Sequence, residues 1–312
     1  MRLSLGCPRN IFTAGVAILL FLAAWPPVPT QPAPAEPPST IAGTLIVMVP
    51  ANAGLVVAAD SRTSPVKGID CDNQVKIFEP ARPNHTILTV TGTPTILEPS
   101  SKPVPLGRIC DYINSTSRIL DIRKVVQDFL EESGAETIAA LDMSALVKRC
   151  IDATRSALAQ GGIKLHLRRT QDMFSVVIAA YDPQTGSSAA RSFVIGLTKQ
   201  LDPVLARTFE RKATPDDNQN YWAFGETDYL YRQVVRGIGR RYLSPATTRF
   251  YTTRRPVRDV SVEEARALAV DLIAATARTT AVVPAPGGIG GPIDVVLVGK
   301  EPRPQHLQWK SP

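Results

Sequence analysis

Residues 43–62 read GTLIVMVPANAGLVVAADSR, and this stretch decides the fold. The run at 44–49 is apolar and β-branched, a composition that favours a strand. Residues 50–54 have turn composition and end on a glycine, and 55–59 form a second apolar run. The stretch therefore predicts two strands joined by a short turn, with the polar residues 60–62 at the end of the second strand.

The rest of the chain alternates between short apolar runs and segments whose apolar residues recur at helical spacing. The predicted further strands are 75–78, 86–90, 174–180, 192–195 and 293–298. The predicted helices are 117–132, 144–159, 228–236 and 261–277, and Ser261 and Glu264 have the spacing of a capping box at the start of the last one. Strands, two helices, strands, two helices and a final strand indicate layered sheets flanked by helices.

Residues 43–62 closely resemble the start of proteasome β-type subunits and their bacterial relatives, which belong to the N-terminal-nucleophile (Ntn) hydrolases. In that family a glycine-threonine processing point precedes a strand, a turn ending in glycine and an Ala-Ala-Asp-Ser-Arg strand. The family also separates its threonine, aspartate and essential lysine evenly, and here the steps are equal, since 60 − 44 = 76 − 60. The resemblance covers 43–300 and implies an α+β fold, the four-layer αββα sandwich.

The resemblance also implies a catalytic centre, consisting of Thr44, Asp60, Lys76 and Arg62, with the amide of Gly92 in the oxyanion hole. A threonine hydroxyl becomes a nucleophile when a base takes its proton, and an N-terminal threonine can use its own α-amine. On this interpretation Lys76 lowers the pKa of the hydroxyl, Asp60 keeps Lys76 charged and in place, and Arg62 supports Asp60 or the loop.

Taken singly, each of these residues has a structural explanation. Thr44 could be an ordinary β-branched residue of a strand, and Asp60 and Arg62 could form a surface ion pair. Lys76 could be an exposed side chain, and Gly92 could simply end a strand. Thr40 is an alternative nucleophile, because it lies four residues earlier and so on the same strand face. The joint pattern and its ungapped spacing favour Thr44.

Two later stretches depart from the family pattern. A Gly-Ser-Gly element is usual there, and this chain has Phe224-Gly-Glu-Thr227, with a glutamate near the place of the serine. The late Asp…Ser-Gly-Gly element has become Pro284-Ala-Pro-Gly-Gly-Ile-Gly-Gly291, which contains neither the aspartate nor the serine. In the family those groups hold the α-amine of the threonine and a water molecule next to it. Their loss therefore argues against peptidase activity.

The N-terminus has the composition of a secretory signal peptide. Arg2 and Arg9 precede a short apolar run at 11–25, which is followed by Ala33-Pro34-Ala35. We expect 1–25 to be a signal peptide or an N-terminal anchor, 26–39 a Pro/Ala-rich linker or propeptide, 40–300 the Ntn domain and 301–312 a tail. The chain is then secreted or periplasmic, or held at a membrane by an uncleaved first segment.

Export affects how the cysteines are interpreted. Cys71, Cys110 and Cys150 remain after removal of the signal peptide, and Cys110 with Cys150 is the preferred disulfide pair because both lie in the segment predicted to be helical. The three histidines are scattered and no C-x-x-C occurs, so we expect no metal site and no cofactor. The net charge is +7, but aromatic residues are few and do not alternate with the basic ones, which argues against a nucleic-acid partner.

Three functions follow from the resemblance. The first is an exported threonine-nucleophile hydrolase that cleaves an amide or peptide bond, and the second a non-catalytic binding or scaffold protein with the same fold. The third is an Ntn amidase acting on small substrates. The expected partner is a peptide or a small amide, and assembly into a homo-oligomer is left open.

Overall fold

The chain divides into two compact units, Met1–Glu36 and Pro37–Pro312. All described residues of the computed structural model belong to the second unit and are 44–66, 69–72, 74–98, 104–162, 167, 169–253, 255–283 and 288–308. The predicted signal peptide or anchor, the Pro/Ala-rich linker and Thr40 lie outside the described residues.

The stretch at 43–62 forms the centre of the first sheet. Its two apolar runs pair antiparallel, and the second of them also pairs with the last predicted strand. The strands of this sheet are, in spatial order, β12 (Trp222–Gly225), β1 (Leu45–Ala51), β2 (Gly54–Asp60), β13 (Ile293–Gly299) and β14 (Gln305–Gln308). The edge strand β14 lies within the segment expected to be a tail.

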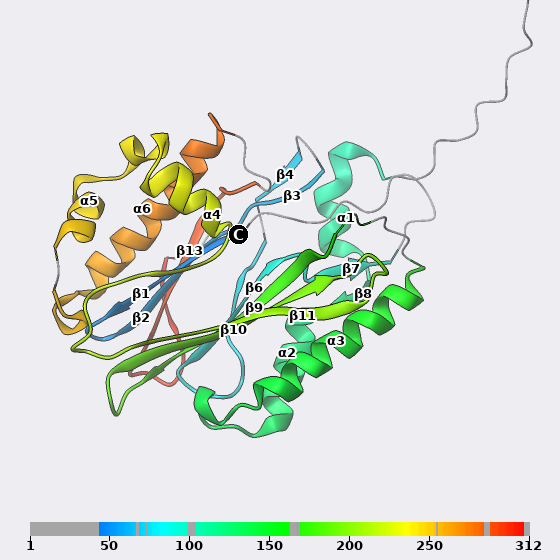
Figure 1. Cartoon of the computed structure of the whole chain (residues 1–312), viewed down its shortest axis with the longest axis horizontal. Coiled ribbons are helices and arrows are strands. Elements are labelled where there is room, and N and C mark those ends of the chain that lie inside the picture. Colours follow the sequence, from blue (N-terminus) through cyan, green and yellow to red (C-terminus); the bar gives the residue numbers. More distant parts are fainter. Residues whose placement is uncertain are drawn as a thin grey trace, which may run out of the picture. The chain divides into compact units, whose positions relative to one another are not determined.

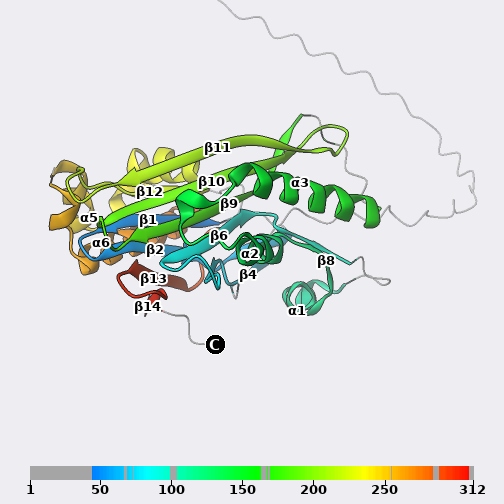
Figure 2. The ribbon, with the colours of Figure 1, turned by 90° about the horizontal axis from the view of Figure 1, so that it is seen from below.

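The second sheet consists of five antiparallel strands and is built around two long ones. In spatial order it contains β11 (Pro203–Ala213), β10 (Ser187–Leu197), β9 (Gln171–Asp182), β6 (Thr86–Gly92) and β5 (Ile77–Phe78). In Figure 2 the labelled strands of the first sheet, and β11, β10, β9 and β6 of the second, follow one another in these orders.

The two sheets pack face to face, and helices cover their outer faces (Figure 1). Alternation along β1 explains the layers, because Ile46 and Met48 face the second sheet while Leu45 and Val47 face helix α6 (Val262–Thr280). On the other side, α2 (Ile122–Ser133) and α3 (Met143–Gln160) cover the second sheet. The four-layer αββα sandwich that the sequence predicts is therefore confirmed.

Smaller elements lie between these layers and around the site. They are two hairpin-like pairs, β3 (Thr63–Val66) with β4 (Ile69–Cys71) and β7 (Thr95–Leu97) with β8 (Arg118–Asp121), and the helices α1 (Ile109–Ser115), α4 (Thr227–Tyr229) and α5 (Pro245–Thr252). Of these elements only α4 was predicted from the sequence, and β11, β12 and β14 were not predicted either.

One predicted boundary is wrong. The helix expected from residue 117 begins only at Ile122, because Arg118–Asp121 forms β8. The Asp121 side chain accepts a hydrogen bond of 3.1 Å from the amide of Arg123 and so caps the helix at its true start. The predicted helix at 228–236 forms as α4 followed by a π-helical segment, Leu230–Val235.

The predicted disulfide is also wrong. Cys71 at the end of β4 is bonded to Cys110 in α1, and Cys150 is a buried free thiol within α3. Cys150 faces the apolar cluster between α3 and the second sheet, where burial raises the pKa of its thiol to about 12. Cys150 therefore belongs to the apolar face of α3, which packs on the second sheet, and it is not paired with Cys110.

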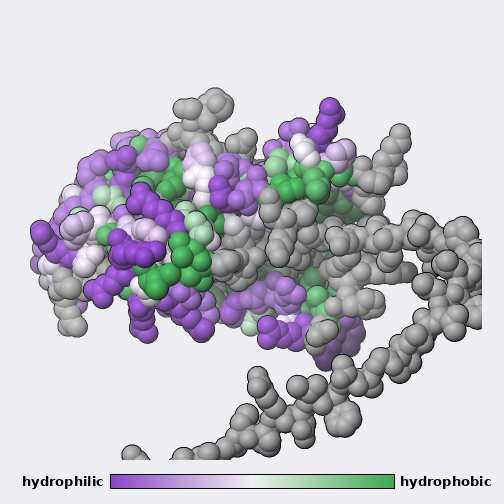
Figure 3. Space-filling view, turned by 90° about the horizontal axis from the view of Figure 1, so that it is seen from above, coloured by the Kyte–Doolittle hydropathy of each residue, from purple (hydrophilic) through white to green (hydrophobic). Residues whose placement is uncertain are grey.

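Among the described residues, the large exposed apolar side chains do not all come from one element. Large exposed apolar side chains come from separate elements, for example Leu106, Phe209 and Val282. Figure 3 shows one side of the molecule, on which hydrophilic and apolar residues are interspersed. Single exposed apolar side chains of this kind are normal for a folded domain.

Within the described ranges, no helix combines the length and the apolar character that crossing a membrane requires.

We expect the disulfide to stabilise the domain, because it closes a long loop between β4 and α1. The double variant Cys71→Ser, Cys110→Ser should lose about 2–4 kcal/mol of unfolding free energy in urea titrations. A reductant should destabilise the parent chain and leave the double variant unchanged. Recovery of a Cys110–Cys150 cross-linked peptide after digestion would contradict this pairing.

Candidate active site

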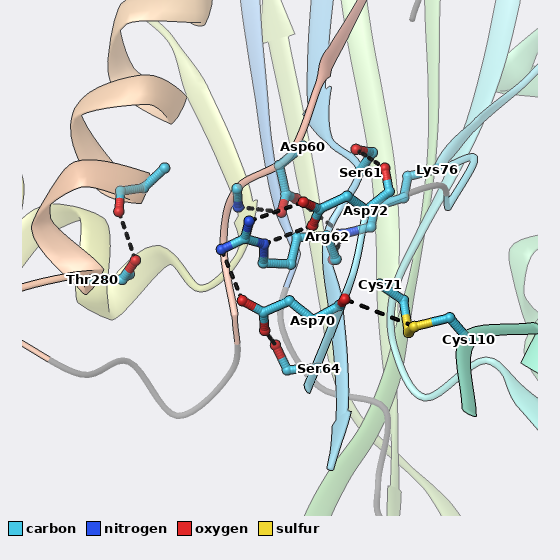
Figure 4. Close-up of polar contacts among 12 residues, drawn as sticks. Asp60, Ser61, Arg62, Ser64, Asp70, Cys71, Asp72, Lys76, Cys110 and Thr280 are labelled. Carbon is cyan, nitrogen blue, oxygen red and sulfur yellow. Dashed lines mark hydrogen bonds and ion pairs between the residues drawn. A yellow bond between two sulfur atoms is a disulfide. The ribbon is translucent and has the colours of Figure 1, made fainter. Parts of the chain in front are cut away.

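Asp60 lies at the end of β2 and has no solvent exposure. Its Oδ1 accepts a hydrogen bond from the amide of Leu45 at 2.9 Å and from Nζ of Lys76 at 3.0 Å. Its Oδ2 accepts one from the amide of Gly290 at 3.1 Å. Three separate segments of the chain therefore meet at one carboxyl group (Figure 4).

The ion pair between Asp60 and Lys76 is buried on both sides, since the two side chains are 0% and 6% exposed. Burial raises the pKa of the Asp60 carboxyl, and the charge of Lys76 and the amides of Leu45 and Gly290 act in the opposite direction. A pair of this kind costs free energy to desolvate, and it is stable only because its remaining lone pairs are also satisfied.

Thr44 lies directly before β1 and is 5% exposed. The next residue, Leu45, donates its amide to Asp60, so the same carboxyl holds both Lys76 and the backbone beside Thr44. Thr44, Lys76 and Gly92 line one pocket. The structure thus brings together Thr44, Asp60, Lys76 and Gly92, and their catalytic roles stay a prediction.

Gly92 ends β6 with a φ of +80°, a conformation that favours glycine. A Cβ at this position would lie 2.5 Å from the carbonyl oxygen of Met173 in the neighbouring strand. The backbone at residue 92 can therefore keep this conformation and this close approach to Met173 only with a glycine.

The side chain of Arg62 binds Asp70 and Asp72 around β4, and no hydrogen bond joins it to the Asp60 side chain among the described contacts. Its guanidinium forms two hydrogen bonds to Asp72, of 2.7 and 3.0 Å, and an ion pair of 2.9 Å with Asp70. These hydrogen bonds lower the pKa of Asp72. Of the two roles considered for Arg62, support of the loop is the one that the geometry fits (Figure 4).

The backbone of Arg62 joins the same network. Its amide donates to the carbonyl oxygen of Gly290 at 3.0 Å, and its carbonyl oxygen accepts from Nζ of Lys76. A Cβ on Gly290 would lie 3.0 Å from the Arg62 guanidinium, so the side chain of Arg62 packs directly on this glycine. Arg62 therefore fixes the loop that supplies a donor to Asp60.

Three residues that contribute to the site were not predicted from the sequence. Gly290 acts through its backbone, for which no side-chain signal exists, and the run of glycines before β13 showed only that the chain turns there. Asp70 and Asp72 flank Cys71 in a segment not predicted to be a strand, so their approach to Arg62 depends on the β3–β4 pairing.

Glu226 occupies the place next to Thr44, in the stretch that departs from the family pattern. Its amide donates to the carbonyl oxygen of Thr44 at 2.9 Å, and the preceding Gly225 has a φ of +89°. A Cβ on Gly225 would lie 2.0 Å from the same carbonyl oxygen, so this close approach requires glycine. Burial raises the pKa of the Glu226 carboxyl, and the nearby Asp228 and Asp60 raise it further.

A search of the described part of the chain finds no group of three His, Cys, Asp or Glu side chains that could hold a metal ion.

No protein-family model matches the chain, and no curated protein matches it. Solved structures of Anbu proteins do match. Anbu (ancestral beta-subunit) from Yersinia bercovieri is 15% identical with a TM-score of 0.42, over 86% of this chain and 88% of that one. A helical assembly of the Anbu complex from Pseudomonas aeruginosa is 18% identical with a TM-score of 0.41, over 85% of each chain. A Gly-1 mutant of Anbu from Hyphomicrobium sp. strain MC1 is 15% identical with a TM-score of 0.40, over 86% of this chain and 89% of that one.

These matches correct the resemblance stated from the sequence. An exported bacterial relative of the proteasome β-type subunits was expected, whereas the matched structures are Anbu proteins at low identity, and none is described as exported. At these values the likeness assigns no activity to this chain. The layers and sheet orders described above give the fold, which is of the proteasome-like Ntn type.

Removing the Asp60 charge should destabilise the domain strongly. In Asp60→Asn, Lys76 is left as an uncompensated buried cation, which costs about 3–5 kcal/mol of unfolding free energy. The matched control is Asp70→Asn, because Asp70 is 43% exposed and Arg62 keeps Asp72 as a partner. Its cost should stay within ~1 kcal/mol. Similar urea midpoints for the two variants would show that the Asp60 pair does not hold the domain together.

Glu226→Gln should change stability in a pH-dependent manner. The pKa of Glu226 is raised in the folded chain, so ionisation disfavours the folded state as the pH rises through that pKa. In the full-length chain, the thermal midpoint of the variant should exceed that of the parent at pH 8, and this gain should be absent at pH 4. Glu210→Gln on the exposed strand β11 is the control and should shift neither midpoint. A gain of equal size at both pH values would refute the electrostatic explanation.

Proposed function

We propose that this protein is a threonine-nucleophile hydrolase that cleaves an amide or peptide bond, with Thr44 as the nucleophile. The observation that carries the proposal is that one carboxyl group, that of Asp60, holds both Lys76 and the backbone beside Thr44. Thr44 and Lys76 also face the same pocket as Gly92.

The reaction requires cleavage of the bond between Gly43 and Thr44, because only then does Thr44 carry a free α-amine. That amine takes the hydroxyl proton while Oγ attacks the substrate carbonyl carbon. Lys76 stabilises the developing alkoxide, and the amide of Gly92 donates to the oxyanion. In a comparable site one such donor is worth ~2.7–4 kcal/mol of transition-state stabilisation. The substrate C–N bond then breaks as the α-ammonium gives its proton to the leaving amine, which leaves the acyl group on Oγ. In the second half the α-amine takes a proton from water as the water attacks the acyl carbon, and it returns that proton to Oγ when the C–Oγ bond breaks.

Glu226 supports this view of the processed chain. Its electrostatic neighbours among the described residues, Asp60 and Asp228, are both anionic, and its amide is bonded to the carbonyl of Thr44. Because the amide of Glu226 is bonded to Thr44, we infer that an α-ammonium at Thr44 comes close enough to this partly buried carboxyl to stabilise its charged form. Glu226 would then do for the amine what the serine and aspartate of the family pattern do.

The second candidate is a non-catalytic binding or scaffold protein. The observation that favours it is that, in the described part of the loop next to Asp60, the backbone of Gly290 contacts Asp60, where the family pattern has an aspartate and a serine. The small-substrate amidase differs from the preferred function only in its substrate and shares its nucleophile.

The predicted export is proposed on separate grounds. The disulfide between Cys71 and Cys110 supports folding in an oxidising compartment, where such bonds persist. Self-association of this chain remains a prediction from the sequence.

Maturation and activity should both depend on Thr44. The intact mass of the parent protein should correspond to a chain that begins at Thr44, and Thr44→Ala should retain residue 43 and lose hydrolysis of a peptide mixture by roughly 10³-fold or more. Thr208→Ala, on the exposed strand β11, is the matched control and should mature and hydrolyse normally. A parent chain that begins near Glu36 and hydrolyses nothing would favour the scaffold protein.

A further inference from the structure

The pocket beside Thr44 carries positive charge on its walls. Lys76, Arg118 and Arg123 line it, and no carboxylate is among the described residues that line it. Its remaining lining residues are apolar or neutral, for example Val90 and Gly92. The positive charge of Lys76 is balanced by Asp60, so the two arginines decide what the pocket attracts.

The two arginines share one carboxyl group. Oδ2 of Asp121 is 2.5 Å from Arg118 and 2.7 Å from Arg123, and Oδ1 of Asp121 accepts a second hydrogen bond from Arg123 at 2.8 Å. Burial acts to raise the pKa of Asp121, but the hydrogen bonds from Arg123 and Arg118 outweigh it and the pKa is lowered, so this carboxyl is ionised. Two guanidinium groups against one carboxylate leave a net charge of +1.

Both arginines have supporting contacts beyond their shared carboxylate. The guanidinium of Arg123 lies 5.1 Å from the ring centroid of Phe78, and its side chain is 16% exposed. Arg118 is 31% exposed and is the first residue of β8, the strand that pairs with β7. A second carboxylate entering the pocket would find donors that are already oriented and partly desolvated, which is the condition under which charge-assisted hydrogen bonds discriminate well.

We propose that this pocket selects substrates with an acidic side chain, Glu or Asp, on the residue that supplies the carbonyl of the cleaved bond. The proposal rests on the hydrolase function, because it assumes that this carbonyl lies between Thr44 and Gly92. The side chain of that residue is the nearest substrate group to the pocket, and its carboxylate completes a cluster of two arginines and two carboxylates. A lysine or arginine there meets like charges and is rejected.

The test uses the mature protein and four peptides that differ only in this residue, which is Glu, Gln, Leu or Lys. Gln matches Glu in shape, so the ratio of kcat/KM for Glu over Gln measures the charge alone. We expect a ratio of about tenfold or more, equivalent to about 1.4 kcal/mol, and the lowest kcat/KM for Lys.

In Arg118→Gln the Glu/Gln ratio should fall to less than about threefold, and Arg118→Lys should lie between the two because it keeps the charge without the planar fork. The matched control is Arg149→Gln, whose arginine pairs with Glu132 on the exposed surface of α3 and should leave the ratio unchanged. Circular dichroism and urea midpoints check that each variant is folded.

Binding provides a readout that does not depend on turnover. On Thr44→Ala, the dissociation constants of acetylated tripeptides ending in Glu-amide and Gln-amide are measured by calorimetry, and the Glu peptide should bind about tenfold more tightly. A third peptide, ending in Gln with a free carboxylate, tests the chain end as the source of the negative charge. If it binds as tightly as the Glu-amide peptide, the pocket recognises the C-terminal carboxylate of a peptide and the proposal is overturned.

The failures of the two proposals are distinguishable. Hydrolysis that depends on Thr44 but shows a Glu/Gln ratio near one, or a ratio that Arg118→Gln does not change, overturns the acidic selectivity and leaves the hydrolase standing. Tighter binding of the Glu-amide peptide without hydrolysis of any peptide overturns the hydrolase and keeps a pocket for acidic side chains. Equal binding of the Glu and Gln peptides with no hydrolysis overturns both.

Discussion

The carboxyl group of Asp60 is fully buried, and it can be so only because three separate segments of the chain bring it donors. An unpaired carboxylate in this position would cost far more than the domain could tolerate. The start of β1, Lys76 and the loop before β13 must therefore occupy fixed positions around Asp60. Fixing these three segments around Asp60 also fixes Thr44 and Lys76, and both residues line the pocket.

A second network holds the first in place. Arg62 bonds to Asp70 and Asp72 on one side and, through its backbone, to Gly290 and Lys76 on the other. The disulfide of Cys71 adds a covalent link from the same hairpin to α1, whose Ile113 lines the pocket. The groups around Asp60 are thus positioned by a scaffold that does not itself reach the candidate nucleophile, and rigidity of this kind is what a preorganised site requires.

The sequence predicted the parts that depend on local patterns. The runs at 44–49 and 55–59 could be identified as strands because β-branched residues fill both faces of a buried sheet, and equal spacing brought Thr44, Asp60 and Lys76 together. The parts that depend on tertiary pairing were missed. Arg118–Asp121 has helical periodicity but pairs with β7, and Cys110 meets Cys71 only because α1 packs beside β4. Gly290 could not be found at all, since a backbone amide leaves no trace in residue type.

The distribution of charge follows one rule throughout the site. The cations on the pocket wall pair with carboxylates that do not line the pocket, Lys76 with Asp60, while Arg118 and Arg123 share Asp121. The domain thereby tolerates a positive cavity, because the desolvation cost of the cations is offset by partners outside the space that a substrate would occupy. Glu226 is the reverse case, a partly buried carboxyl whose electrostatic neighbours among the described residues are acidic. On the proposed function that imbalance belongs to the unprocessed chain, and the cation that removes it is the one that cleavage before Thr44 creates.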